Sequence, residues 1–173
     1  AGAIMAEGGM ARRLVDFAAV VIGFTRIRGG LSQVNILATT IMSGISGSSV
    51  ADTSAIGSVM IPQMAEKGYP RVFATNVTIS ASLQAIIVPP SHNSVIYSLA
   101  TGGVVSMTSL FLAGVLPGLL LGFSLMLLCL FYAYRDKHPK GEPVPIRQAV
   151  RMLRDAIWGI VSLVIVLGGI LTG

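Results

Sequence analysis

The sequence predicts an all-α polytopic membrane protein built around a re-entrant helical hairpin and a broken transmembrane helix. Three observations support this fold class. The 173 residues are 53% hydrophobic and 11% charged, with a mean hydropathy of +0.80, which is too apolar for a soluble domain. Residues 43–57 form a polar, glycine-rich island inside apolar sequence. Residues 72–134 contain no Asp, Glu, Lys or Arg.

The charge pattern excludes nucleic acid as the expected partner and favours a lipid bilayer. The net charge is +5, but the twelve Lys and Arg residues lie between the apolar segments, with almost no aromatic residues interleaved. Loops enriched in basic residues on one side of a membrane explain this distribution better. The single cysteine, Cys129, lies within an uncharged run and cannot form an intrachain disulfide, so we assign it to packing.

Residues 1–28 are predicted to contain the end of a span and an interfacial helix. The apolar stretch 14–25 is too short to cross the bilayer, and arginines flank it at both ends. These features favour a helix that lies along the membrane surface. A short tilted or broken span is the alternative.

Residues 29–66 are predicted to form the re-entrant hairpin. Asp52 is the one charged residue between Arg28 and Glu66. The apolar runs 31–42 and 53–64 each contain about a dozen residues, so each reaches only ~18 Å of the ~30 Å hydrocarbon core. We therefore expect a hairpin that enters and leaves on one side. Its Ser/Gly tip would lie near mid-membrane, where non-helical backbone is tolerated only beside protein or a water-filled cavity.

Residues 67–134 are predicted to form a broken span followed by an ordinary span. The first, residues 72–100, is interrupted at residues 89–93, where two adjacent prolines break the helix and leave carbonyls free. The second span covers residues 110–134, and residues 101–108 form the turn between them.

Residues 135–155 are predicted to form a basic cytoplasmic loop with an amphipathic lead-in helix, and residues 156–173 begin the next span. We expect His138, in this loop, to be solvated. The re-entrant hairpin leaves residues 28 and 67 on the same side of the membrane, and the two spans that follow bring residue 135 back to that side. All the basic clusters then lie in the cytoplasm of a multi-pass protein, as the positive-inside rule requires.

The hairpin tip and the helix break are the candidate binding elements. Half-helix ends near mid-membrane hold ions and substrates in many secondary transporters, and two interrupted elements in one apolar region indicate such a site. The end of the first arm offers carbonyls to a hard cation such as Na⁺, and the start of the second arm favours an anion. Close packing of small residues is the structural alternative. The candidate ion ligands, mainly through backbone carbonyls, are Ser43, Gly44, Gly47 and Pro89, and the candidate substrate contacts are Ser46, Ser48, Ser49, Ser91, His92 and Asn93.

Two ionisable residues accompany these elements. Asp52 is expected in the first turn of the second arm, where the helix dipole stabilises it and where it supports the tip and the ion site. Direct ion or proton binding by Asp52 is the alternative. His92 can contact substrate, carry a proton or hydrogen-bond to the carbonyls freed by the break.

Three strings resemble the large membrane subunit of tripartite ATP-independent periplasmic (TRAP) transporters. They are SGSSVADTSAIG at residues 46–57, IIVPPSHNSVIY at residues 86–97 and LAGVLPGLLLG at residues 112–122. The likeness covers essentially the whole chain, which resembles roughly the N-terminal half of such a subunit, without its first spans and second repeat. His92 and Asn93 depart from the apolar residue expected most often after the PPS of this family.

The resemblance implies one half of an inverted-repeat, elevator-type transporter in the bacterial inner membrane. The implied activity is Na⁺-driven import of organic anions such as C4-dicarboxylates or sialic acid. The implied partners are a periplasmic substrate-binding protein and a small membrane subunit, and the implied cofactor is Na⁺. The tip and the break would supply Na⁺ ligands and one wall of the substrate cavity.

Two other function classes stay open from the sequence. One is a membrane scaffold or channel that transports nothing. The other is an intramembrane serine protease, because residues 44–47 match GxSG and would make Ser46 a nucleophile with a histidine base. On balance the chain is predicted to be no enzyme.

Overall fold

The computed structural model describes residues 9–25 and 27–139, together with eight single positions between 152 and 169. This part of the chain contains helices and no strand, which confirms the all-α prediction. The helices are α2 (Met10–Gly23), α3 (Gly30–Ser46), α4 (Ser49–Glu66), α5 (Arg71–Ser82), the 3₁₀ turn η1 (Leu83–Ile86), α6 (His92–Ala100) and α7 (Met107–Arg135).

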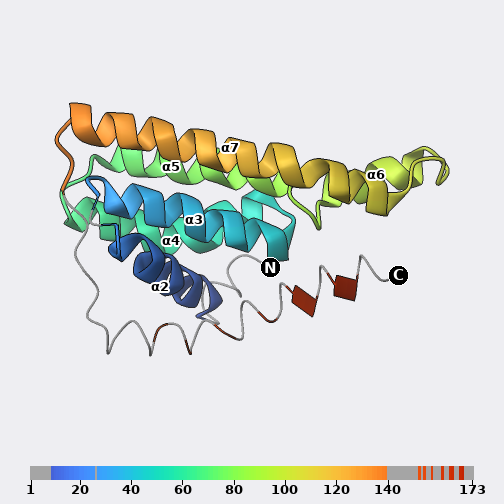
Figure 1. Ribbon diagram of the computed structural model, residues 1–173, viewed down its shortest axis with the longest axis horizontal. Coiled ribbons are helices and arrows are strands. Elements are labelled where there is room, and N and C mark those ends of the chain that lie inside the picture. Colours follow the sequence, from blue (N-terminus) through green and yellow to red (C-terminus); the bar gives the residue numbers. More distant parts are fainter. Residues whose placement is uncertain are drawn as a thin grey trace.

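The helices form an elongated bundle (Figure 1). Helices α3 and α4 are antiparallel and are joined at Gly47 and Ser48, and α2 covers one side of this pair. Helix α5 lies along the hairpin, and α7 runs beside α5 and then α6. Helix α6 and the first part of α7 extend beyond the hairpin tip (Figure 1). The tip therefore lies next to the middle of the broken span.

The main apolar core lies between α2 and the hairpin. Leu14, Met42, Ile56 and Met60 are completely buried in it. Helix α2 begins four residues before the predicted stretch, and its buried positions recur at the three- and four-residue spacing of one helix face, so it packs closely on α3 and α4. Its placement along the membrane surface stays a prediction.

The two arms of the hairpin are longer than expected. Helix α3 has 17 residues and α4 has 18, so each reaches ~25 Å or more at a rise of ~1.5 Å per residue. The apolar runs 31–42 and 53–64 therefore underestimate the arms, because helix continues through most of the polar residues 43–57. The serines and Asp52 hydrogen-bond to one another, so these polar residues remain helical and only Gly47 and Ser48 leave the helix.

The broken span also differs from its prediction. Regular α-helix ends at Ser82, earlier than the prolines, and continues as the turn η1 before an irregular stretch at residues 87–91. His92 and Asn93 were expected inside the break, but they form the first turn of α6. The Ser91 hydroxyl accepts a hydrogen bond from the Ser94 amide, so Ser91 caps this helix and α6 resumes one residue after the double proline.

Helix α7 presents a glycine face to the irregular stretch. A Cβ atom on Gly114 would lie 2.2 Å from the Ile87 carbonyl oxygen, and one on Gly118 would lie 2.4 Å from Val88 Cγ2. These glycines are one helical turn apart, so they allow the irregular backbone to approach α7 closely. Among the described helices, α7 is the one long and apolar enough to cross a membrane.

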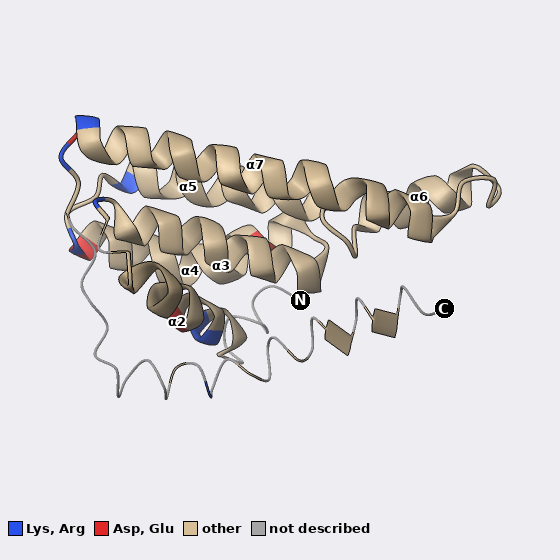
Figure 2. Ribbon diagram, in the orientation of Figure 1, with Lys and Arg blue, Asp and Glu red and all other residues tan. Residues whose placement is uncertain are grey.

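Most charged side chains of α3 to α7 gather at the end of the bundle opposite the hairpin tip, whereas the basic residues at the start of α2 lie apart from them (Figure 2). The start of α3, the end of α4, the start of α5 and the end of α7 all meet there. The prediction that His138 is solvated was wrong. The residue is 7% exposed, and its ring packs against Tyr69 and Phe73 with centroid separations of 4.9 and 4.7 Å. The predicted loop and span beyond residue 139 lie outside the continuously described residues.

Candidate functional site

The tip of the hairpin is a two-residue turn. Gly47 has φ +60°, which is the left-handed conformation that glycine adopts readily, and its amide donates to the Ser43 carbonyl at 3.1 Å. Ser48 follows in an extended conformation and caps α4, with its hydroxyl 3.4 Å from the Ala51 amide. The chain therefore leaves one helix and starts the next with almost no intervening loop.

Asp52 ties the two arms together beneath this turn. It lies in the first turn of α4, as predicted, and is completely buried. The Ser43 hydroxyl donates to Asp52 Oδ2 at 2.7 Å, and the Ser46 hydroxyl donates to Asp52 Oδ1. Both serines come from α3, so one carboxylate bridges the two helices. Positive helix-dipole charge at the α4 N-terminus stabilises the carboxylate further.

The hairpin tip fits into the break of the α5–η1–α6 span. The His92 Nδ1 atom lies 2.8 Å from the Gly47 carbonyl oxygen, and the His92 amide donates to the same oxygen at 3.4 Å. Because a carbonyl oxygen only accepts, Nδ1 carries the proton. A Cβ atom on Gly47 would lie 1.8 Å from the Pro90 carbonyl oxygen. Only a glycine allows this approach of tip and break.

The remaining predicted residues are distributed around this contact. Pro89 and Ser91 are buried in the break, and Asn93 is exposed on the first turn of α6. Ser49 instead lines a hollow of about 420 Å³ between α4 and α5, beside Val50 and Ile79. The structure therefore brings Ser43, Ser46, Gly47, Asp52 and His92 together, and it does not bring Ser49 and Asn93 into that group.

The tip contains oxygen atoms suited to a hard cation. The last-turn carbonyls of a helix have no intrahelical donor, and this applies to Gly44 and Ile45 in α3. The Ser43 hydroxyl donates to Asp52, which leaves its oxygen lone pairs available to a metal ion. The Ser46 hydroxyl also donates to Asp52, but its oxygen accepts from the Ser48 amide at 3.1 Å, so one lone pair remains. The Gly47 carbonyl already accepts two hydrogen bonds from His92, so in this conformation it is the least available of the predicted ligands.

A polar stripe on α3 was missed at the sequence level. Asn35, Thr39 and Ser43 are completely buried and follow one another at intervals of four residues, so they lie on one helix face that leads to the tip. The Asn35 amide donates to the Thr78 hydroxyl of α5 at 2.8 Å. Thr40 similarly donates to the buried Gln84 side chain of η1 at 3.0 Å. The four-residue spacing was the signal that identifies this stripe.

These hydrogen bonds join the hairpin to the broken span along most of its length. Buried polar groups in an apolar protein are costly unless they find partners, and here α3 supplies the partners of α5 and η1. The Gln33 side chain also donates to the Met126 carbonyl of α7 at 2.9 Å. The hairpin and the broken span are therefore held as one unit on which the tip contact rests.

Comparison with known proteins identifies the family. The model of the family "Tripartite ATP-independent periplasmic transporter, DctM component" matches residues 1–173. The chain belongs to this DctM family. It is 42% identical over 172 residues to the C4-dicarboxylate TRAP transporter large permease protein DctM of Pseudomonas aeruginosa, covering 99% of this chain and 39% of that protein.

Two further relatives also match the chain from end to end. The chain is 40% identical to the uncharacterized protein YgiK of Salmonella typhimurium over 173 residues, covering 100% of the chain and 39% of the relative. It is 35% identical to the 2,3-diketo-L-gulonate TRAP transporter large permease protein YiaN of Escherichia coli over 173 residues, covering 100% of the chain and 40% of the relative. The DctM-family chain thus spans about two fifths of the length of these permeases.

Proposed function

We propose that this chain forms part of a secondary transporter that imports organic anions across the bacterial inner membrane, driven by a Na⁺ gradient. Membership of the DctM family supports this class. The observation that carries the proposal is the contact between the hairpin tip and the helix break at Gly47 and His92. Two interrupted helices that meet within apolar protein are typical of substrate and ion sites in secondary transporters.

In this proposal the hairpin is re-entrant, and its tip holds the coupling ion. Both bases of the hairpin lie at the charged end of the bundle (Figure 2), which favours entry and exit on one side of the membrane. Carbonyls of the last turn of α3 and the hydroxyls of Ser43 and Ser46 would bind Na⁺ as neutral oxygen ligands. Asp52 would hold these hydroxyls in place.

The substrate would lie against the exposed side of the same contact, near Ser48, Ser91 and His92, with the second repeat of the complete subunit forming the opposite wall. A periplasmic binding protein would deliver the organic anion, and a small membrane subunit would complete the permease, as the tripartite family implies. Dicarboxylates and sugar acids are the substrate types in the names of two of the relatives, which favours organic anions of this kind. An elevator movement of the hairpin and broken span together would expose the site alternately.

The test replaces Ser46 and Ser48 with alanine in the complete transporter, reconstituted with its partners in liposomes. We expect the double variant to lose Na⁺-dependent uptake. In the parent, Na⁺ binds the folded state and should raise the melting temperature above that in K⁺, and we expect the variant to lose this rise as well. Ser54→Ala is the matched control, because Ser54 is exposed on α4 and its hydroxyl donates only to the neighbouring Ala51 carbonyl. A double variant that folds, transports and responds to Na⁺ like the parent would refute the proposal.

The coupling ion is tested separately at His92. Neutral oxygen ligands do not titrate, so uptake should depend steeply on Na⁺ and only weakly on pH between about 6 and 8. Coupling through a proton carried by His92 would instead allow uptake with a proton gradient alone. Uptake by the parent and by His92→Gln is measured across this range, with a Na⁺ gradient and then with a proton gradient alone. Proton-driven uptake that disappears in the variant would replace Na⁺ by protons as the coupling ion.

A further inference from the structure

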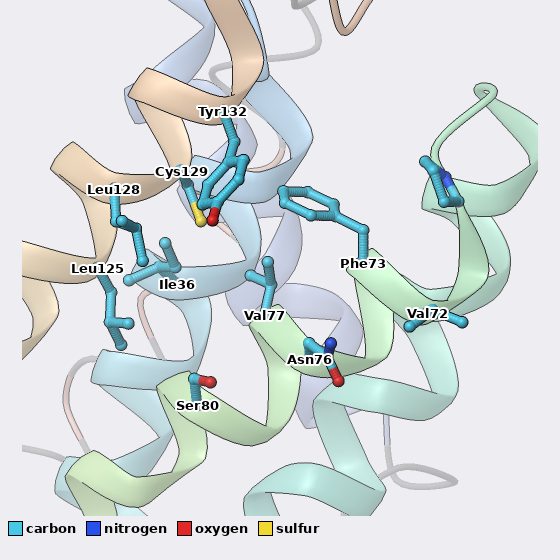
Figure 3. Close-up of a pocket in the computed structure, with 11 residues that line it drawn as sticks. Ile36, Val72, Phe73, Asn76, Val77, Ser80, Leu125, Leu128, Cys129 and Tyr132 are labelled. Carbon is cyan, nitrogen blue, oxygen red and sulfur yellow. The ribbon is translucent and has the colours of Figure 1, made fainter. Parts of the chain in front are cut away.

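A lateral groove of about 430 Å³ opens between α5 and α7 (Figure 3). Phe73 and Val77 of α5 line one wall, Leu125 and Leu128 of α7 line the other, and Ile36 of α3 closes the inner side. The lining is predominantly apolar. Such a groove on a membrane protein has the character of a site for a hydrocarbon chain rather than for a soluble ligand.

Two polar side chains interrupt the apolar lining on one face of α5. Asn76 and Ser80 are one helical turn apart and both line the groove. Asn76 is exposed, and neither side chain forms a hydrogen bond within the part of the chain that the structure describes. An amide without a partner is costly in an apolar medium. Both side chains can donate hydrogen bonds, so the groove offers donors to a ligand with acceptor groups at this depth.

One end of the groove reaches the charged end of the bundle. Pro70 and Tyr132 line this end, and Arg71 directly follows Pro70. The Arg135 guanidinium lies 4.5 Å from the centre of the Tyr132 ring and is also paired with Asp136 at 2.8 Å. Arg71 has no ion pair among the described residues, so it is the uncompensated cation beside the groove.

We propose that the groove binds an anionic phospholipid, with its phosphate near Arg71 and Arg135, its ester carbonyls at Asn76 and Ser80, and an acyl chain along the α7 wall. The cations lie at one end of the groove, the donors Asn76 and Ser80 lie farther along α5, and the α7 wall opposite them is apolar at Leu125 and Leu128. Asn76 is five residues from Arg71, or ~7.5 Å along the helix, between headgroup and chain. Anionic lipids are enriched on the cytoplasmic side, where positive-inside topology places this end.

A single hydrocarbon chain is thinner than a helix of ~10 Å and can lie in a groove of about 430 Å³. A packed helix inserts only one face into such a groove, so the basic residues at the end of the groove, rather than its volume, favour an anionic lipid over a helix. The inference rests on the membrane placement of the proposed function, but it does not depend on transport.

The test measures lipid retention by the purified complete transporter in native mass spectrometry. The probes are phosphatidylglycerol and phosphatidylcholine with identical acyl chains, titrated into the detergent. We expect tighter retention of phosphatidylglycerol by the parent. Arg71→Gln should weaken phosphatidylglycerol binding about fivefold, because one basic residue near the surface contributes ~1 kcal/mol. It should weaken phosphatidylcholine binding less, because the choline cation already offsets the charge of the same phosphate. Asn76→Leu should weaken the binding of both lipids, because it removes the donors to the esters.

Lys137→Gln is the matched control, because Lys137 is an exposed cation at the same end and neither it nor its chain neighbours line the groove. Arg71, in contrast, lies between the lining residues Pro70 and Val72. Lys137→Gln should leave retention of both lipids unchanged. Equal retention of the two lipids by the parent, or equal effects of Arg71→Gln and Lys137→Gln, would overturn the proposal. So would a helix of the complete transporter seated in the groove. These outcomes are independent of uptake, so loss of transport alone leaves the lipid site standing.

Discussion

Gly47 combines two requirements at the point where the hairpin touches the broken span. Its backbone is left-handed, which costs an L-residue roughly 1–2 kcal/mol, and its Cα faces the Pro90 carbonyl without room for a side chain. Its own carbonyl accepts both donors of His92. Backbone conformation, packing and hydrogen bonding therefore depend on one residue.

Gly47→Ala should destabilise the complete protein by about 3 kcal/mol, from backbone strain plus the clash with Pro90. Gly68→Ala separates the two causes. Gly68 has φ +88°, but a Cβ atom added there would meet no atom within 4 Å, so this variant should show only the backbone cost of ~1–2 kcal/mol. The measurement is the unfolding midpoint in detergent. Equal shifts for the two variants would mean that the tip does not pack against the break.

Asp52 is the second residue on which the tip depends. Asp52→Ala leaves the Ser43 and Ser46 hydroxyls without their shared acceptor, and we expect a loss of about 2 kcal/mol, since hydrogen bonds to charged groups contribute ~1.5–3 kcal/mol each and removal of the buried charge offsets part of this. Asp52→Asn retains one acceptor oxygen and should lie between the alanine variant and the parent. Ser54→Ala, exposed on the same helix, should be nearly neutral. An Asp52→Ala protein as stable as the parent would contradict the bridging role.

At the scale of elements, the segment after α7 folds back onto the base of the hairpin. The Gly29 amide donates to the Pro139 carbonyl at 3.0 Å, and His138 packs between Tyr69 and Phe73. Burial lowers the pKa of His138, and the nearby Asp136 opposes this only in part. His138 therefore binds a proton more readily when the segment after α7 is detached from the base of the hairpin (open) than when it is packed there (closed). The closed segment is fully favoured above the ordinary histidine pKa of ~6.5 and becomes less stable as the pH falls below it.

Hydrogen exchange at the Gly29 amide measures this closure. After correction for the intrinsic exchange rate, protection should fall as the pH decreases below about 6.5 in the parent protein. In His138→Phe, which retains the aromatic packing and cannot titrate, protection should stay constant. The same decline in both proteins would assign the pH dependence to another group.

The sequence was sufficient to predict a hairpin with its turn in the Ser/Gly region, a break near the double proline and the position of Asp52 in the first turn of α4. Apolar runs, proline and a lone acid determine these features locally. The continuation of α3 and α4 through the polar residues was not predictable in the same way, because it depends on the cross-helix bonds of Asp52. The burial of His138 likewise depends on aromatic side chains about 65–69 residues earlier in the chain.

At the scale of the whole molecule, the arrangement of charge orients the chain. Arg28, Glu66, Arg71 and Arg135 lie near the ends of four different helices, and the charged ends meet at one end of the bundle (Figure 2). The turn between α6 and α7 lies at the other end and contains no charged residue. If α3–α4 enters and leaves on one side, the broken span and α7 each cross the membrane once. The positive-inside rule then places the charged end in the cytoplasm.

Single cysteines introduced into a Cys129→Ala background test this orientation in intact cells. Glu66→Cys and Lys137→Cys change exposed positions at the charged end, and Val104→Cys changes a residue that is 87% exposed in the α6–α7 turn. A membrane-impermeant thiol reagent should label only position 104 from the periplasm, and positions 66 and 137 should react only after the membrane is permeabilised. The decisive position is 66. If it is labelled from the periplasm while 137 is not, an odd number of crossings separates the two positions. The arrangement of a re-entrant hairpin followed by two spans would then be contradicted.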